Sequence, residues 1–297
     1  MHYPYSLYVK LADREDSLPE IPLPQGTIRY RDSGDGPPVV FIHGLLVDGT
    51  LWRKVTPLLD ATARSIVPDL PLGSHRIAMN EGADMTPAGV ARLVGDFLAA
   101  LDLQDVTLVG NDTGGAITQL VALDHGERVG RLVLTNCDCF EVFPPKEFVP
   151  MIKAASVPGA LYAAMQPMRS AAARRTTIAY GGLAHDIPDE VTAGWTQPFL
   201  DDAGVRRDTA AFLRAVDKSI MLDAAARLPS LQIPALIAWG QDDRFFSPEL
   251  GRRLAAVFAN ARLEPIAGAR TFVAEDAPEA LADLIRGFVR ETAPQPA

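Results

Sequence analysis

Cysteine is scarce in this chain: only two occur among its 297 residues, Cys137 and Cys139. A single residue separates them, which leaves too short a loop for a comfortable disulfide and too few ligands for a metal site. The pair is therefore expected to be reduced, as in the cytoplasm, and no metal is expected.

Basic clusters and long apolar runs are also missing. The formal net charge is −9, and the adjacent arginines at 174–175, 206–207 and 252–253 are isolated pairs. This charge argues against nucleic acid or an anionic membrane surface as a partner. No apolar stretch is long enough to span a bilayer, and residues 1–5 lack the basic start and apolar run of a signal peptide. We expect a cytoplasmic protein whose partner is a small-molecule substrate.

The glycines lack the G-x-G-x-x-G spacing of dinucleotide sites, so no nucleotide or flavin cofactor is expected. The sequence leaves the oligomeric state open.

What the chain does have is an alternation of strand and helix patterns up to about residue 140, which favours crossover units and a parallel sheet. Residues 140–228 then show helical stretches without a strong strand run, and are read as a helical insertion into a core of 1–139 and 229–297. The first two dozen residues are expected to form a surface arm. Strands are predicted at 26–31, 38–42, 65–69, 106–109, 131–134, 234–240 and 261–265, and helices at 48–59, 87–101, 116–121, 248–258 and 278–289.

The most informative segment is the turn Gly110–Gly114. Its spacing is that of a nucleophile elbow, G-x-S-x-G, with Asp112 in place of serine. A buried strand precedes it and a helix follows, so the carboxyl would project at the strand end above a helix N-terminus. A glycine turn with an incidental aspartate is the simpler alternative.

Two further segments lie at predicted strand ends. His43-Gly44-Leu45 follows a buried strand, and in such folds the residues after His-Gly and after the nucleophile supply the N–H groups of an oxyanion hole. That assigns Leu45 and Thr113, with His43 expected to hold the loop. The pair 242–243 follows a late strand and suits the acid of a triad, although two adjacent aspartates can also form a plain turn.

In this order the three motifs resemble the α/β-hydrolase superfamily over nearly the whole chain. The resemblance implies a mostly parallel sheet flanked by helices, with 140–228 as a lid domain. It makes Asp243 the triad acid, and an aspartate nucleophile at Asp112 is similar to haloalkane dehalogenases, fluoroacetate dehalogenases and epoxide hydrolases. In that branch the carboxylate forms a covalent ester, which a histidine-activated water then hydrolyses.

The pattern breaks where the family places its histidine, because Thr271 occupies that slot. Threonine has no pKa near neutrality and cannot serve as the base, so an ester at Asp112 could form and then stall. His75 is the first candidate substitute and His185 the second, although a hydrogen-bonding or surface role is the simpler reading of each. Asp138 follows the next strand, where some dehalogenases place the triad acid, although capping the start of the lid is the simpler role for it.

Two more departures from the family pattern narrow the range of expected substrates. Haloalkane dehalogenases hold the halide with a tryptophan after the nucleophile and a polar residue after His-Gly, where this chain has Thr113 and Leu45. Epoxide hydrolases use two lid tyrosines, and the insertion has only Tyr162 and Tyr180, for which packing is the simpler role.

The sequence thus favours a hydrolase-type enzyme acting on a small apolar molecule. Two alternatives stay open: a non-hydrolytic acid–base enzyme (isomerase, lyase or cyclase) in which Asp112 carries a raised pKa, and a non-catalytic protein that binds a ligand in the same pocket.

Overall fold

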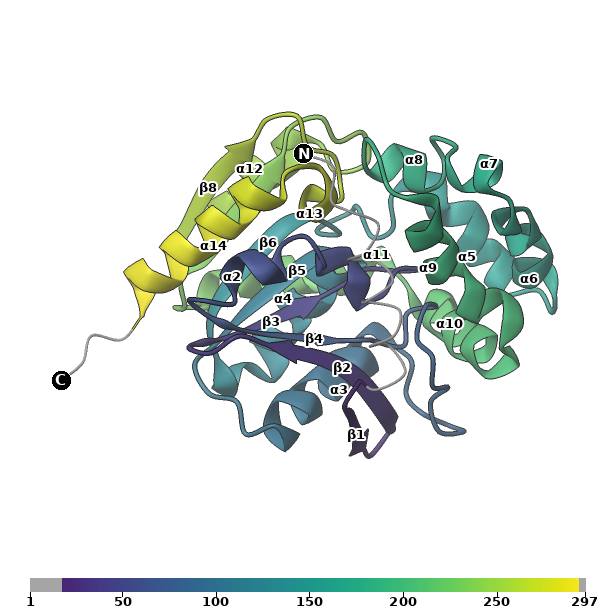
Figure 1. Ribbon diagram of the computed structural model, residues 1–297, viewed down its shortest axis with the longest axis horizontal. Helices are drawn as coiled ribbons and strands as arrows, with labels where there is room; N and C mark the ends of the chain where they lie inside the picture. Colours follow the sequence, from purple (N-terminus) through teal and green to yellow (C-terminus); the bar gives the residue numbers. More distant parts are fainter. Residues whose placement is uncertain (1–17, 294–297) are drawn as a thin grey trace.

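Apolar runs become the central strands of an eight-stranded sheet in the computed structural model, which describes residues 18–293 (Figure 1). The two strands at one edge are antiparallel to their neighbours and the others are parallel, as crossover connections require. Across the sheet the order is β1(Glu20–Leu23), β2(Gly26–Ser33), β4(Arg64–Pro68), β3(Pro38–Ile42), β5(Val106–Asp112), β6(Val129–Cys137), β7(Ala235–Gly240) and β8(Ala261–Ile266).

Helices cover both faces of this sheet. On one face α2(Thr56–Leu59) contacts α14(Pro278–Thr292), and both lie in front of the strands in Figure 1. On the other face α3(Pro87–Ala100) packs on the elbow helix α4(Thr113–Asp124). The predicted α/β-hydrolase architecture of a mostly parallel sheet flanked by helices is confirmed. The core is completed by α12(Pro248–Val257), α13(Val273–Asp276), and the short 3₁₀ helices η2(Gly126–Arg128) and η5(Leu228–Ser230).

Two local predictions were wrong. Residues 20–23, expected within a surface arm, pair antiparallel with β2, while the arm's residues 1–17 lie outside the described part of the chain. The single helix expected over 48–59 is instead η1(Gly49–Trp52) followed by α2. Asp48 caps η1 by accepting from the Thr50 N–H at 2.9 Å, and Pro57 has no N–H with which to continue a helix from that turn.

Between β6 and β7 the chain is helical, and most of this insertion lies to one side of the sheet in Figure 1. It has a small apolar cluster of its own around Leu161, Phe199 and Val205. Its last helix packs against α4, on the core. The elements are η3(Lys146–Phe148), α5(Val149–Ala155), α6(Ala160–Met165), η4(Gln166–Arg169), α7(Ala171–Arg174), α8(Tyr180–Leu183), α9(Asp189–Asp201), α10(Ala203–Ala215) and α11(Lys218–Arg227).

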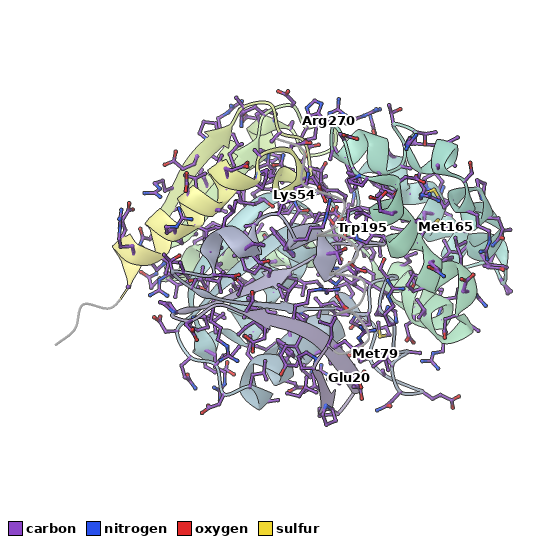
Figure 2. All side chains as sticks on the ribbon, viewed as in Figure 1. Glu20, Lys54, Met79, Met165, Trp195 and Arg270 are labelled. Carbon is purple, nitrogen blue, oxygen red and sulfur yellow. The ribbon has the colours of Figure 1, made fainter. Side chains whose placement is uncertain are left out.

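Trp195 fastens this insertion to the core. It lies between the insertion and the sheet (Figure 2). Its Nε1 donates to Thr50 Oγ1 at 2.7 Å, and its ring makes edge contacts with Tyr180 and with Phe272 of the core. Arg270 adds a second link by donating to the carbonyls of Gly181 and Ala184. These contacts set α8 and α9 beside the strand ends that carry the elbow.

Both cysteines are reduced and buried at the end of β6, with Cys137 0% and Cys139 1% exposed. Among residues 18–293, no helix combines the length and the apolar character needed to cross a bilayer.

Candidate active site

Asp112 occupies a sharp bend between β5 and α4. Its backbone has φ +53° and ψ −133°, a conformation that costs a non-glycine residue about 1–3 kcal/mol and is found mainly at functional sites. The bend needs Gly114, because a Cβ there would lie 2.3 Å from the Ile42 carbonyl oxygen. The turn therefore presents the Asp112 side chain at the end of the sheet instead of burying it within a strand.

The loop after β3 closes around this side chain. A Cβ on Gly44 would lie 2.1 Å from Asp112 Oδ2, so only glycine leaves room for the carboxylate. The backbone N–H groups of Thr113 and Leu45 interact with that carboxylate as hydrogen-bond donors and lower its pKa. The two residues assigned to the oxyanion hole thus lie on either side of Asp112.

His43 holds the loop from below. Its Nε2 accepts from the Leu70 N–H at 2.8 Å, so the proton is on Nδ1, which donates to the Gly44 carbonyl at 2.9 Å. The ring is completely buried, and burial lowers its pKa. With both ring nitrogens occupied, His43 positions Gly44 and is not available as a base.

Asp243 lies just beyond β7. Its Oδ1 accepts from the N–H groups of Phe245 and Phe246, and its Oδ2 accepts from Asn136 Nδ2 at 2.8 Å. Burial outweighs these hydrogen bonds and raises its pKa to about 6. The carboxyl is held in one orientation by groups that favour its ionised form.

Thr271 is fully buried in the segment that follows β8. Asn111 Nδ2 donates to its backbone carbonyl at 2.7 Å, which ties this segment to the elbow. The Thr271 hydroxyl is near enough to Asp243 to lower the pKa of that acid but makes no hydrogen bond of ordinary geometry. The position next to Asp243 is therefore occupied by a side chain that cannot take up a proton.

Asp138 is brought next to Asp112 by the pairing of β5 with β6. Its backbone N–H donates to the Asp112 carbonyl at 3.3 Å, and its Oδ2 accepts from Thr113 Oγ1 at 2.9 Å. Burial, followed by the charge of Asp112, raises its pKa well above the usual range. Thr113 thus contacts both carboxyl groups, one through its N–H and the other through its hydroxyl.

Asp112 itself has a pKa raised to about 7, first by burial and also by the negative charge of Asp243. No lysine, arginine or histidine within residues 18–293 lines the cavity that the acid faces. The carboxyl therefore exchanges its proton near neutral pH. No group of three potential ligands in this part of the chain could hold a metal ion.

The cavity above Asp112 has a volume of about 440 Å³ and lies between the strand ends and the insertion. Asp112 and Asp138 contribute to its floor, and its walls are mostly apolar. The wall residues include Leu45, Leu46, Phe143, Met151, Leu161, Met165, Met168, Tyr180, Leu183, Phe212 and Leu213.

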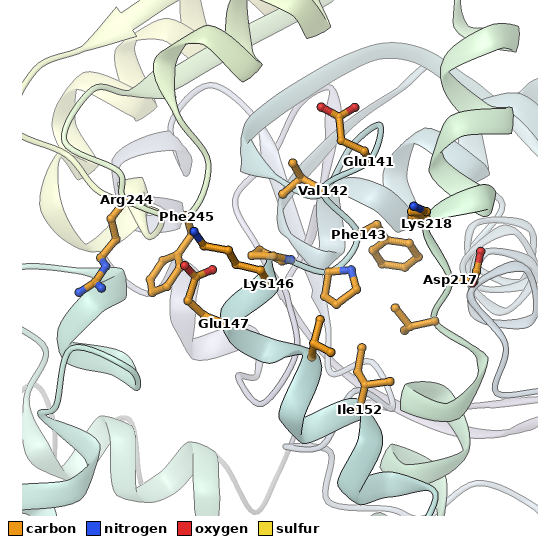
Figure 3. A pocket seen from close by; sticks show the side chains of 14 residues that line it. Glu141, Val142, Phe143, Lys146, Glu147, Ile152, Asp217, Lys218, Arg244 and Phe245 are labelled. Carbon is orange, nitrogen blue, oxygen red and sulfur yellow. The ribbon is translucent and has the colours of Figure 1, made fainter.

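A larger, outer depression of about 660 Å³ adjoins it and holds none of the three acids (Figure 3). Lys146, Lys218 and Arg244 lie around this outer space together with Glu147 and Asp217. The two spaces share wall residues: Phe143, Pro144, Pro145, Glu147, Ile152 and Val216.

The candidate substitute histidines lie away from the cavity. His75 is 2% exposed, and its Nε2 lies 3.3 Å from Asp208 Oδ2, in a buried pair beneath α10. His185 is exposed, and its backbone N–H donates to Asp276. Neither residue lines the cavity.

The tyrosines of the insertion differ in position. Tyr180 lines the cavity, but its hydroxyl is committed to the Leu46 carbonyl at 2.5 Å, and burial raises its pKa. Tyr162 is 38% exposed beneath the Arg206 guanidinium.

Sequence reasoning missed Asn111 and Asn136, which tie the strand ends together. Asn136 Nδ2 contacts Asp243, and its Oδ1 accepts from the Gly240 N–H at 2.6 Å. Asparagine at a strand end carries no signal of such a role, because it is equally common in turns.

Comparison with known proteins places this geometry in context. Residues 39–284 match the profile of the alpha/beta hydrolase family. The chain is 29% identical over 271 residues to "Haloalkane dehalogenase 2" of Mycobacterium tuberculosis, covering 88% of this chain and 91% of that protein. It is 30% identical over 246 residues to a 2-hydroxy-6-oxononadienedioate/2-hydroxy-6-oxononatrienedioate hydrolase of Cupriavidus pinatubonensis, covering 80% and 81%.

Among solved structures, a haloalkane dehalogenase from Bradyrhizobium elkani has a similar fold, with a TM-score of 0.76 and 19% identity over 93% of this chain and 98% of that one. A thermophilic esterase from Thermogutta terrifontis gives a TM-score of 0.72 and 22% identity, over 93% and 100%. The match over residues 39–284, together with these folds, shows that the chain belongs to the alpha/beta hydrolase family.

Proposed function

We propose that this protein is a hydrolase-type enzyme in which Asp112 attacks an electrophilic carbon of a small apolar molecule and forms a covalent ester. The observation that carries the proposal is the placement of Asp112. Its strained backbone directs the carboxyl into an apolar cavity, between the N–H groups of Leu45 and Thr113. Residues 140–228 act as the lid that closes the cavity.

The roles of the neighbouring groups follow from charge. Attack requires the ionised form of Asp112. When water later attacks the ester carbonyl, negative charge develops on its oxygen, and the N–H groups of Leu45 and Thr113 would stabilise it. Asp243 is the supporting acid. With Thr271 beside it in place of an imidazole, Asp243 has no base through which to activate water.

The cavity also constrains the substrate. A volume of about 440 Å³ with mainly apolar walls suits a small apolar molecule. Relatives include a haloalkane dehalogenase and a hydrolase named for a dioate substrate. The lack of basic side chains along the cavity, among residues 18–293, argues against a dicarboxylate bound there.

Intact-mass measurement tests the proposal. The protein is incubated with 1-bromohexane, with 1,2-epoxyhexane and with an activated ester, and peptide mapping locates any adduct. We expect the bromide to leave one adduct per chain, on Asp112, any of the probes to react only through that residue, and neither adduct nor turnover in Asp112→Asn. Asp208→Asn is the matched control, because it makes the same change at a buried acid outside the cavity. Absence of any adduct and of any turnover in the unmodified protein would refute the nucleophile role.

A second function is favoured by one observation, the pKa of about 7 at Asp112. A carboxyl that exchanges its proton near neutrality could catalyse an isomerisation, elimination or cyclisation without a covalent step. Deuterium uptake from solvent into a substrate would support this function. Incorporation of ¹⁸O from labelled water into Asp112 would contradict it, because that label enters only through ester hydrolysis. Tight ligand binding without any chemistry, unchanged in Asp112→Asn, would instead indicate a binding protein.

A further inference from the structure

Asp138 is a second acid on the floor of the cavity, fixed relative to Asp112 by three contacts. Its N–H donates to the Asp112 carbonyl, its carbonyl accepts from Gln119 Nε2 at 3.1 Å, and its Oδ2 accepts from Thr113 Oγ1. The residue is 2% exposed and lines the same cavity as Asp112. The two carboxyl groups therefore share one neighbour, Thr113, and one ligand space.

One oxygen of this acid is unused. Asp138 Oδ1 is buried and has no hydrogen-bond partner among the residues the structure describes. A buried polar atom without a partner costs about 1–3 kcal/mol and requires an explanation. Because Asp138 also lines the cavity, a bound molecule is a candidate partner for that oxygen.

Most other proton donors along the cavity are absent or committed, and the exposed Glu147 lies where the cavity meets the outer depression. The Tyr180 hydroxyl donates to Leu46, and no histidine within residues 18–293 lines the space. The Thr113 hydroxyl is engaged with Asp138 itself. Asp138 is thus the group in this part of the chain best placed to exchange a proton with a molecule bound at Asp112.

We propose that Asp138 is a further catalytic residue, which donates a proton to the leaving oxygen of a strained cyclic ether and later recovers one from the water that hydrolyses the Asp112 ester. This inference rests on the proposed function, because it requires Asp112 to be the nucleophile. It supplies the base that the chain lacks at position 271.

In the first step an ionised Asp112 oxygen bonds to a ring carbon of an epoxide, and the bond from that carbon to the ring oxygen breaks. The ring oxygen takes the proton of Asp138. The products are a hydroxyalkyl ester of Asp112 and an ionised Asp138. Esterification removes the negative charge of Asp112, one of the two causes that raise the pKa of Asp138, so the loss of that proton becomes easier as the reaction proceeds.

In the second step the ionised Asp138 accepts a proton from water, whose oxygen bonds to the carbonyl carbon of the ester. The carbonyl oxygen becomes an oxyanion beside the N–H groups of Leu45 and Thr113. Collapse breaks the bond to the alkyl oxygen, which takes the proton of the newly added hydroxyl. A diol leaves, Asp112 is again ionised and Asp138 is again protonated, so the cycle consumes only epoxide and water.

An alkyl halide gives a different outcome in the same site. Halide ion leaves without a proton because it is a very weak base, so Asp138 stays protonated when the ester forms. A protonated acid cannot activate water. The site therefore turns over an epoxide and stalls on the matching halide.

The experiment compares 1,2-epoxyhexane with 1-bromohexane in single-turnover reactions of the full chain, followed by intact mass. We expect diol from the epoxide without a lasting adduct, and a persistent hexyl ester on Asp112 from the bromide. In H₂¹⁸O, one epoxide turnover should place the label in Asp112.

Asp138→Asn keeps the size of the side chain and an oxygen that can accept from Thr113, but it cannot transfer a proton. We expect it to slow the epoxide reaction by about 10²–10⁴-fold while the bromide still alkylates Asp112 at a rate near that of the unmodified protein. The retained alkylation shows that the variant is folded. Asp208→Asn again serves as the buried control outside the cavity.

Each result is decisive. If Asp138→Asn keeps its rate on the epoxide, or if the bromide-derived ester is hydrolysed as fast as the epoxide-derived one, the role of Asp138 is wrong while the nucleophile role of Asp112 stands. If neither probe modifies Asp112 in the unmodified protein, the proposed function fails and this inference fails with it.

Discussion

Asn111 Nδ2 donates to the backbone carbonyl of Thr271 at 2.7 Å, which joins the residue before Asp112 to the segment that follows β8. The contact is made to the backbone of residue 271 and so does not depend on its side chain. A different side chain at this position would be held at the same place, next to Asp243.

The substitution Thr271→His is therefore expected to place a base beside Asp243. Hydrolysis of the hexyl ester on Asp112 should accelerate by about 10²–10⁴-fold, measured as decay of the adduct by intact mass. Thr271 is fully buried, so the larger ring should also lower the free energy of unfolding by about 1–3 kcal/mol.

The double variant Thr271→His/Asp243→Asn separates the effect of the added base on ester hydrolysis from the effect of the larger ring on packing. It should retain the volume added by the histidine ring but lose most of the increase in the rate of ester hydrolysis, because the imidazole no longer has the Asp243 carboxylate beside it. Adduct decay that is unchanged in a folded Thr271→His protein would show that position 271 does not face the ester.

Ester formation should depend on pH through Asp112, whose pKa is raised to about 7. Only the ionised carboxyl attacks, so the rate constant for alkylation by 1-bromohexane should fall about tenfold per unit below pH 7 and level off above it. Because the charge of Asp243 contributes to that raised pKa, Asp243→Asn should shift the midpoint to lower pH. A midpoint that does not move in this variant would indicate that another group controls the profile.

Gly44→Ala should inactivate the site without a general loss of structure. The added Cβ would lie 2.1 Å from Asp112 Oδ2, so the carboxylate must leave its place between the two N–H groups. We expect alkylation to slow by about 10²-fold or more, as on loss of a stabilising donor. Gly287→Ala is the control, because Gly287 lies in α14 and a Cβ added there would come no nearer than 3.9 Å to another side chain. This variant should retain full activity. Unchanged alkylation in Gly44→Ala would mean that the carboxylate does not need its contact with this loop.

The free energy of unfolding should also depend on the ionisation of Asp112. Its pKa is higher in the folded protein than the model-compound value of 3.8, so the folded state binds the proton more tightly and the free energy of unfolding falls as pH rises from about 4 to 7. Asp112→Asn removes this dependence. Urea titrations should show a larger stabilisation by this variant at about pH 8 than at about pH 5, and an equal effect at both would contradict the raised pKa.

Much of the core could be predicted because its strands are continuous apolar runs and its motifs are local in sequence. The run 38–42 became β3 with the expected bounds, and β5 led into the bend at Asp112 as its glycines indicated. Pro57 was the signal that the helix over 48–59 would break, and the amphipathic pattern around it masked that signal.

The contacts around Asp138 could not be predicted. Whether Asp138 faces the cavity or only caps the insertion depends on the rotamer of Thr113 and on the register between β5 and β6, and neither is encoded locally. Likewise, nothing in the sequence around Tyr180 indicates that its hydroxyl is bound by Leu46, more than a hundred residues away.

The buried thiols at the end of β6 have a practical consequence for a protein that handles alkylating molecules. Burial raises the pKa of Cys137 and Cys139 well above the usual value, so almost none of either is thiolate, the form that reacts with electrophiles. Neither thiol lines the cavity, so a molecule bound there meets the carboxyl groups of Asp112 and Asp138 and no thiolate, although a thiol lies one residue to each side of Asp138. The two cysteines are thereby protected from alkylation in the folded protein, and covalent labelling experiments on it should not be confounded by modification of its thiols.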